Sequence, residues 1–253
     1  MSTIFAIANQ KGGVGKTTTA VNLAACLAIG GKRCLLIDLD PQANATSGLG
    51  GEKRSQGGAE AALTAPEQPD AWIEKTHIDN LALVPATDRL GSVGRMLRHA
   101  VDPAGQLRRA RPHVADRFDL VLIDCPPSSG LLPLNALVAA DLVIIPVQCE
   151  YYAMEGLAQM LETLGRAQAD HQTDVDVGGF LFTMYDPDVP LAEEIAAEVL
   201  SHFESKTYRT RVPRDPLLGE APSHGLPAVE YAPRSRGTNA YVQLTREIVN
   251  GTE

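Results

Sequence analysis

The chain has 253 residues, of which 44% are hydrophobic and 21% are charged. This balance is typical of a globular protein with a sizeable core, and because no stretch resembles a long linker we expect one domain over residues 1–253. The formal net charge of −9 means that the molecule as a whole repels nucleic acid and anionic lipid, so contact with either would depend on a local basic patch.

The first predicted strand, Thr3–Asn9, leads into a glycine-rich loop and then into a helix over Lys16–Ile29. The glycines permit a tight turn that aims successive backbone N–H groups at one point, and the start of the helix adds the positive end of its dipole. We predict a phosphate-binding loop in which Lys16 reaches the β- and γ-phosphates of a nucleotide and the Thr17 hydroxyl coordinates Mg²⁺. The expected nucleotide contacts of this loop are Lys11, Gly12, Gly13, Val14, Gly15, Lys16, Thr17 and Thr18.

The loop departs from the ordinary phosphate-loop pattern at its start. That pattern has a glycine five positions before Gly15, whereas Gln10 stands there and an additional lysine, Lys11, follows it. The alternative interpretation is a glycine-rich turn without a ligand. The strand before the loop and the helix after it weaken that alternative, because phosphate binding requires this context.

The second predicted strand, Arg33–Asp38, ends beside two carboxylates, Asp38 and Asp40. In a doubly wound sheet the ligand lies at the carboxyl ends of the strands, and alternation along the chain points both side chains the same way. One carboxylate could bind a Mg²⁺-bound water while the other orients the attacking water. The alternative is a pair of solvated loop aspartates, with Asp40 capping a turn before Pro41.

Further along the chain, short apolar runs alternate with helical patterns, which predicts an α/β fold with a doubly wound, mostly parallel sheet and helices on both faces. The remaining strands are expected at Leu81–Pro85, Asp119–Asp124, Leu142–Val147, Gly178–Met184 and Thr207–Val212. The remaining helices are expected at Arg89–Val101, Gln106–Ala115, Leu134–Ala139, Glu155–Ala167, Leu191–Phe203 and Asn239–Asn250. Between them, Gly50–Asp70 is expected to form a mobile surface loop with a short helix, with Trp72 in a small satellite core beneath it.

The strand Asp119–Asp124 has four apolar residues before its final aspartate. This is the Walker B form, in which Asp124 accepts hydrogen bonds from Mg²⁺-bound waters. Apolar strands that end in aspartate are common, and a purely structural strand is therefore the alternative. Together with the phosphate loop, the pattern favours the magnesium role.

The sequence favours a cytoplasmic location. No basic segment precedes the first apolar run, so we expect no signal peptide, and the longest apolar run is interrupted by Asp141 and Pro146. The cysteines form no Cys-x-x-Cys pair and lie in or beside apolar runs, which predicts buried, reduced thiols. They are Cys26, Cys34, Cys125 and Cys149.

Several motifs together resemble the ParA/Soj branch of the ParA–MinD ATPases, from end to end of the chain. Besides the lysine-rich loop they are Asp38–Asn44, Ile123–Ser128, Pro146–Tyr152, Glu220–Gly225 and Pro233–Gly237. The resemblance implies a Mg²⁺-dependent ATPase of one domain, without an N-terminal DNA-binding extension. It also implies a cycle between an ATP-bound sandwich homodimer and a monomer with ADP or no nucleotide, in which a ParB-like partner stimulates slow hydrolysis.

The resemblance also implies roles for single residues. Lys11 would reach across the dimer interface to the partner's phosphates, Gly12 would lie at the close contact between subunits, and Glu150 would join them at the interface. Asp40 would activate the hydrolytic water. Magnesium would be held by Thr17, Asp38 and Asp124, the carboxylates acting through water, and adenine would be contacted by Met184, Pro213 and Arg214.

Family members of this type position chromosomal DNA, plasmids or other large cargoes, and many hold non-specific DNA when bound to ATP. DNA-binding members commonly carry arginines where Asp188 and Leu217 stand in this sequence. A basic patch could still form from Lys206, Arg209, Arg211, Arg234 and Arg236. The alternative is a solvated strand edge with packed arginine stems. We therefore expect weak, ATP-dependent DNA binding, with nucleoid association if it occurs.

Four other functions fit the lysine-rich loop less well. A MinD-like membrane ATPase needs a basic amphipathic tail, whereas Thr245–Glu253 is balanced in charge and ends acidic. A nitrogenase-iron-type protein needs cluster-binding cysteines, and an ATP-dependent ligase needs a second polar constellation for its substrate. A nucleotide-binding scaffold has no need of a carboxylate that positions water. No histidine has the spacing of a metal ligand.

Overall fold

The computed structural model describes residues 2–252, and its eight strands form a single sheet in the order β3-β4-β2-β5-β1-β6-β7-β8. All neighbouring strands are parallel except β3 and β4, so the predicted doubly wound, mostly parallel sheet is confirmed. The strands are β1 (Thr3–Ile7), β2 (Cys34–Asp38), β3 (Glu74–Lys75), β4 (Leu81–Val84), β5 (Leu120–Asp124), β6 (Leu142–Gln148), β7 (Asp176–Tyr185) and β8 (Thr207–Pro213).

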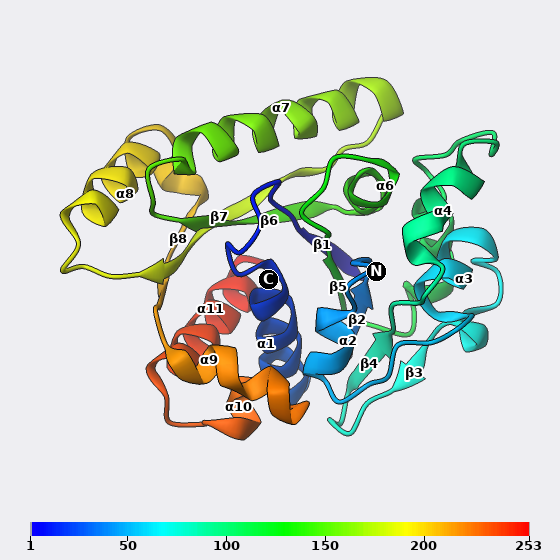
Figure 1. Cartoon of the computed structure of the whole chain (residues 1–253), viewed down its shortest axis with the longest axis horizontal. Coiled ribbons are helices and arrows are strands. Elements are labelled where there is room, and N and C mark those ends of the chain that lie inside the picture. The colour runs from blue at the N-terminus through cyan, green and yellow to red at the C-terminus, as the bar shows by residue number, and fades with distance from the viewer. Residues whose placement is uncertain (1, 253) are drawn as a thin grey trace.

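Helices cover both faces of the sheet (Figure 1). They are α1 (Lys16–Ile29), α2 (Asn44–Gly48), α3 (Gly58–Thr64), α4 (Leu90–Leu97), α5 (Arg111–Val114), α6 (Leu131–Ala139), α7 (Ala153–His171), α8 (Pro190–Phe203), α9 (Pro216–Glu220), α10 (Ala228–Tyr231) and α11 (Arg236–Thr252). In Figure 1, α6, α7 and α8 lie on one side of the sheet, with α1 and α11 on the other. No helix within residues 2–252 is apolar over the length that crossing a membrane requires.

Each central strand contributes to two cores because successive side chains point to opposite faces. Along β1, Ile4 and Ala6 belong to the core under α6 and α7, whereas Phe5 and Ile7 belong to the core under α1 and α11. β1, β2 and β5 therefore read as continuous apolar runs, as expected for strands covered on both faces. All four cysteines are buried and free, which confirms the prediction made for them.

Two predicted helices differ from those in the structure. The segment predicted as one helix, Gln106–Ala115, is a 3₁₀ turn at Leu107–Ala110 followed by the short α5. Pro112, which has no backbone N–H, lies in the first turn of α5, where that loss is tolerated, but it cannot continue a preceding helix. The helix predicted over Arg89–Val101 ends at Leu97, and the Val101 side chain is fully exposed.

The prediction of a satellite core around Trp72 is wrong. Trp72 is fully buried in the main core under α6 and α7, and α3 adds Ala62 and Leu63 to the same core. A Cβ at Gly58 would lie 2.2 Å from the carbonyl oxygen of Pro85, so glycine at this position allows α3 to approach the end of β4 closely. The short helix expected within Gly50–Asp70 is thus present as α3 and packs onto the main core, whereas Glu52, Ser55 and Gln56 before it are exposed.

Candidate nucleotide site

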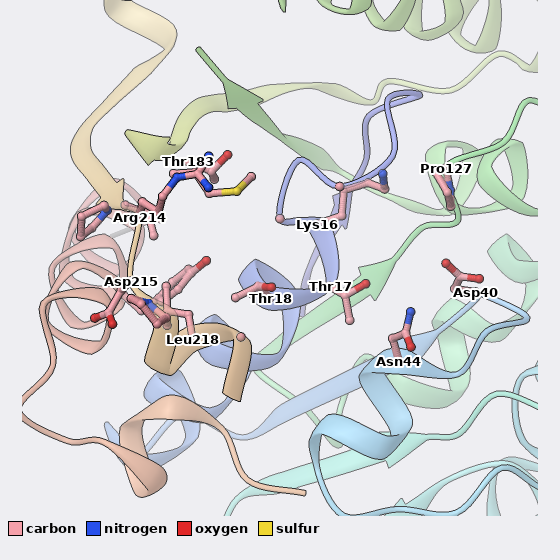
Figure 2. A pocket seen from close by; sticks show the side chains of 18 of the residues that line it. Lys16, Thr17, Thr18, Asp40, Asn44, Pro127, Thr183, Arg214, Asp215 and Leu218 are labelled. Atoms are coloured by element: carbon pink, nitrogen blue, oxygen red, sulfur yellow. The ribbon is translucent and has the colours of Figure 1, made fainter. Parts of the chain in front are cut away.

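A cavity of about 520 Å³ opens at the carboxyl ends of the central strands, a volume suited to a small-molecule ligand. Figure 2 shows Pro127, Asp40 and Asn44 on one side of Lys16 and Thr17, with Arg214, Asp215 and Leu218 on the other. The cavity therefore has two ends. We refer to the part around Lys16, Thr17 and Asp40 as the phosphate end, and to the part around Met184 and residues 212–219 as the base end.

The loop before α1 has the backbone geometry of a phosphate-binding loop. Gly13 and Gly15 have φ angles of 75° and 83°, a left-handed conformation that glycine adopts without steric cost. Gly15 caps α1 without a side-chain hydrogen bond to the helix. The N–H groups of the first turn of α1 thus lack intrahelical acceptors and face the cavity as an anion-binding surface.

Lys16 is a buried cation at the phosphate end. Only 6% of the residue is exposed, and its ammonium donates to the carbonyl oxygen of Lys11 over 2.8 Å. Burial lowers the pKa of Lys16, while the groups of Asp124, Cys125 and Asp40 act in the opposite direction. A phosphate group beside this ammonium would offset the cost of its burial and favour the charged form.

Asp124 has the environment expected of a carboxylate that serves a metal ion. The residue is fully buried, and its Oδ2 accepts from the Thr17 hydroxyl over 2.8 Å. Its Oδ1 accepts no hydrogen bond from residues 2–252. Burial raises the pKa of Asp124 well above its ordinary value, and the Asp38 carboxyl on the neighbouring strand adds to that rise. An unpaired oxygen next to a threonine hydroxyl fits the oxygen ligands of Mg²⁺ and of its waters.

The two aspartates that follow β2 occupy different environments. Asp38 is fully buried, and its carboxylate accepts from the Thr46 N–H (2.8 Å), the Thr46 hydroxyl (2.7 Å) and the Asp40 N–H (3.0 Å). Burial raises the pKa of Asp38 to about 6. Asp40 lines the cavity, and the Gln42 N–H donates to its Oδ1 over 2.9 Å. Since both residues are buried, they are not solvated loop aspartates. The magnesium role of Asp38 stays a prediction, because its carboxylate already organises the loop that carries Asp40.

The residues predicted to contact adenine come together at the base end. Met184, Pro213 and Arg214 all line the cavity, together with Leu218 and Tyr241. Met184 has a φ of 48°, an uncommon conformation for a residue with a side chain. The apolar side chains at this end suit the face of a planar ring.

Sequence reasoning missed two residues that hold the site in place. The Thr183 hydroxyl donates to the carbonyl oxygen of Val14 over 2.8 Å, which ties β7 to the phosphate loop. The carboxylate of Asp215 accepts from the Leu217 N–H (3.1 Å) and the Gly237 N–H (2.8 Å), so it caps α9 and joins it to α11. Asp215 precedes a proline, and aspartate followed by proline is a signal of a helix start that could have identified α9.

The residues predicted for the dimer interface lie together outside the cavity. The Lys11 ammonium lies 3.2 Å from Glu150 Oε2 of the same chain. Gly12 is exposed. Tyr151 and Tyr152 follow Glu150, with 77% and 63% of each residue exposed, and their rings pack edge to face. This corner of the molecule therefore presents charge and apolar surface side by side.

The structure divides the predicted basic patch. Lys206 pairs with Asp176 at 2.8 Å, and Arg211 lies 3.4 Å from Glu193, with its guanidinium over the Tyr185 ring. The other three members, Arg209, Arg234 and Arg236, are exposed, as are Asp188 and Leu217. Two of the five cations are thus already paired with carboxylates.

Comparison with known proteins gives matches over most of the chain. Residues 2–177 match a family model described as an AAA domain. The chain is 48% identical over 252 residues to the sporulation initiation inhibitor protein Soj of Bacillus subtilis, with 98% of each chain covered. It is 42% identical over 247 residues to the chromosome partitioning protein ParA of Myxococcus xanthus, with 97% of this chain and 87% of the relative covered.

One solved structure, described as cobyrinic acid a,c-diamide synthase from Mycobacterium smegmatis with bound ADP and magnesium, has a TM-score of 0.86 to this chain at 32% identity. The match covers 100% of this chain and 96% of the other. The compared regions thus include both the phosphate end and the base end of the cavity.

Proposed function

The chain belongs to the ParA/Soj family of P-loop partition ATPases, and we propose that it cycles between an ATP-bound homodimer and a monomer with ADP or no nucleotide. The observation that carries the proposal is that Lys16 and Thr17 line one end of a nucleotide-sized cavity, where the Thr17 hydroxyl donates to Asp124, whose other carboxylate oxygen has no partner within residues 2–252. ATP and Mg²⁺ as ligands are supported by the Mycobacterium smegmatis structure, which contains ADP and magnesium. The amide-forming activity in its name is not proposed for this chain, because relatives at 43% and 42% identity are a chromosome-partitioning ATPase and a chromosome partitioning protein.

The phosphates of ATP would bind between the glycine-rich loop and the start of α1. The Lys16 ammonium donates to the Lys11 carbonyl oxygen of its own loop, and we propose that a phosphate oxygen of ATP takes the place of that carbonyl. A charged acceptor forms a stronger hydrogen bond than a neutral carbonyl, which favours this exchange. At the base end, Met184, Pro213 and Arg214 would hold adenine.

Mg²⁺, when bound, would neutralise negative charge on the β- and γ-phosphates. The Thr17 hydroxyl and the Asp124 carboxylate are the groups that would hold it, Asp124 through a water. Asp38 lies beside Asp124 in the sheet and would support that position. We propose that Asp40, which lines the cavity, accepts a hydrogen bond from the attacking water and aligns it with the γ-phosphate.

The dimer would form through the corner that carries Lys11, Gly12 and Glu150. Lys11 would then act on the nucleotide of the partner subunit, which explains why the loop carries a second lysine outside the cavity. We propose that hydrolysis is slow in the free protein and that a ParB-like partner stimulates it. The protein would act in the cytoplasm.

A cargo other than DNA is the second candidate, and the charges at the predicted DNA-contact positions favour it. An aspartate and a leucine occupy positions 188 and 217, and two of the five predicted patch cations are ion-paired. Non-specific DNA affinity of about 10⁻⁴–10⁻⁶ M depends steeply on the number of neutralised phosphates. We therefore propose weak, ATP-dependent DNA binding. A gel-shift assay at low salt with the ATP-trapped Asp40→Ala protein tests for weak DNA binding. Free migration of long duplex DNA would contradict such binding.

Membrane binding of the MinD type receives less support. The C-terminal helix α11 buries Leu244 and Ile248 in the core under α1. These side chains are therefore not available as the apolar face of an interfacial helix. Sedimentation with anionic liposomes in the presence of ATP would detect such binding, and we expect the protein to stay in the supernatant.

The proposed activity is tested most directly by Lys16→Ala. We expect loss of ATP hydrolysis by about 100-fold or more, because the substitution removes the cation that stabilises the transferring phosphoryl group. Phosphate release measured with and without Mg²⁺ provides the readout. Lys75→Ala, at an exposed position on β3, is the matched control. Equal turnover in wild type and Lys16→Ala would refute the ATPase assignment.

A further inference from the structure

Lys11 is bound at three points within its own subunit. Its N–H donates to Asn9 Oδ1 over 3.0 Å, its carbonyl oxygen accepts from Lys16, and its ammonium lies 3.2 Å from Glu150 Oε2. Asn9 is anchored in turn, because its side-chain N–H₂ group donates to the carbonyl oxygen of Pro146 over 2.8 Å. The start of the phosphate loop is thus tied to β6 and to the turn that follows it.

Glu150 is itself oriented by a neighbour in that turn. The Glu150 N–H donates to the carbonyl oxygen of Gln148 over 2.8 Å, and the Gln148 side chain donates to Glu150 Oε1. One carboxylate oxygen is therefore fixed by Gln148 while the other faces Lys11. The Lys11 and Glu150 side chains are 28% and 51% exposed, so the ion pair can open without unfolding any element.

A lysine that acts on the nucleotide of another subunit must first leave a carboxylate of its own subunit. We propose that Glu150 is a positioning residue that holds Lys11 on the free subunit and releases it when the ATP-bound dimer forms. The Lys11–Glu150 contact then raises the concentration of ATP-bound protein at which dimers appear. This inference rests on the proposed dimer, and it assigns Glu150 a role within one subunit that precedes any contact with the partner.

The expected effect follows from the exposure of the pair. A surface ion pair changes an equilibrium constant by up to about fivefold. A symmetric dimer requires two such contacts to open, one in each subunit. Loss of the contact should therefore tighten dimerisation by about threefold to about twenty-fivefold.

Sedimentation velocity of the full chain with Mg²⁺ and a non-hydrolysable ATP analogue measures the dimer dissociation constant. Glu150→Gln should lower this constant by about threefold to about twenty-fivefold. Removal of a negative charge could also lower the dissociation constant without any role for the Lys11–Glu150 contact, so two further variants keep the charge. Glu150→Asp shortens the reach to Lys11, and Gln148→Ala frees the carboxylate from its orienting partner. Both variants should lower the dimer dissociation constant, as Glu150→Gln does. Gln148→Ala should lower it by less than Glu150→Asp.

Glu162→Gln is the matched control, because it removes a carboxylate from α7 that pairs with Arg166 rather than with Lys11. It should leave the dissociation constant unchanged, and thermal unfolding midpoints should show that all variants remain folded. Weaker dimerisation of both Glu150 variants would identify Glu150 as a contact to the partner and overturn the proposal. A shift in Glu150→Gln alone would assign the effect to charge and also overturn it. A wild-type protein that stays monomeric with the analogue would contradict the proposed dimer itself, and with it the proposed role of Glu150.

Discussion

The two ends of the nucleotide cavity are built in different ways. The phosphate end combines one continuous loop with residues at or just beyond the ends of two adjacent buried strands, β2 and β5. The base end combines β7, β8 and α9, and the register between β7 and β8 shifts twice. The first end presents charged groups and backbone N–H groups, whereas the second presents mainly apolar side chains, with Arg214 and Asp215 beside them.

Because of this difference, we expect one end to control ATP turnover and the other to control nucleotide affinity. Hydrogen bonds and buried charges act at set distances, so substitutions at the phosphate end should change turnover. Apolar contacts are non-directional, so substitutions at the base end should change nucleotide affinity or local stability and leave the chemical step alone. Each prediction below tests one side of this contrast.

The largest effect is expected for Asp40→Ala. Removal of the carboxylate that aligns the attacking water should lower ATP turnover by about 100-fold to 10,000-fold, the range for general acid–base groups. ATP affinity should change only a few-fold, since Lys16 and the loop remain. Phosphate release at saturating ATP and titration with a fluorescent ATP analogue separate the two quantities. Asp116→Ala, at an exposed position, is the control. A parallel loss of affinity would contradict the contrast.

The phosphate end could be predicted from the sequence because its signals are local. The spacing of Gly13, Gly15 and Lys16 sets a backbone conformation, and an aspartate at or just beyond the end of an apolar strand faces the same edge of the sheet as its neighbours. In the structure, Gly13, Gly15, Lys16 and Asp40 line the same cavity. The sequence could not predict that the Asp38 carboxylate would accept hydrogen bonds from Thr46 and from the Asp40 N–H, because these bonds depend on the path of α2.

Most of the base end could not be predicted in the same way. The helix α9 spans only five residues, too short for an apolar period to appear in the sequence. The Asp215-Pro216 pair is a local signal of the start of α9, but the hydrogen bond from the Gly237 N–H, 22 positions away, could not be predicted. The burial of Trp72 in the main core was missed because it depends on the close approach of Gly58 to Pro85, a contact between distant segments.

The second prediction concerns Asp215→Asn at the base end. Burial alone would raise the pKa of Asp215, but hydrogen bonds from the Gly237 and Leu217 N–H groups lower it below its ordinary value. A carboxylate whose pKa is lower in the folded state stabilises the fold above its unfolded pKa of about 3.9, and this contribution is lost as the pH falls through the folded pKa. At pH 7 the substitution should lower the free energy of unfolding by about 1 kcal/mol.

Denaturant unfolding of wild type and Asp215→Asn at pH 7 and at pH 3 measures this contribution. The difference in the free energy of unfolding between the two proteins should be smaller at pH 3, because the Asp215 carboxylate begins to bind a proton there. Asp174→Asn, at an exposed position before β7, should show a much smaller difference at pH 7. ATP turnover per bound nucleotide should not change. A fall in turnover at saturating ATP would mean that the base end contributes to the chemical step.

The smallest effect is expected for Met184→Ala. The side chain is partly exposed and lines the base end, so its loss should weaken binding of the ATP analogue by about fourfold, the value of one buried methylene group. Alanine keeps the left-handed conformation strained, whereas Met184→Gly relieves it, so the glycine variant should be more stable than the alanine variant by up to about 1 kcal/mol. If the apolar contact alone matters, both variants should bind nucleotide equally weakly and hydrolyse bound ATP at the wild-type rate. Tighter binding by Met184→Gly than by Met184→Ala would mean that the backbone at position 184, rather than the thioether side chain, selects the base.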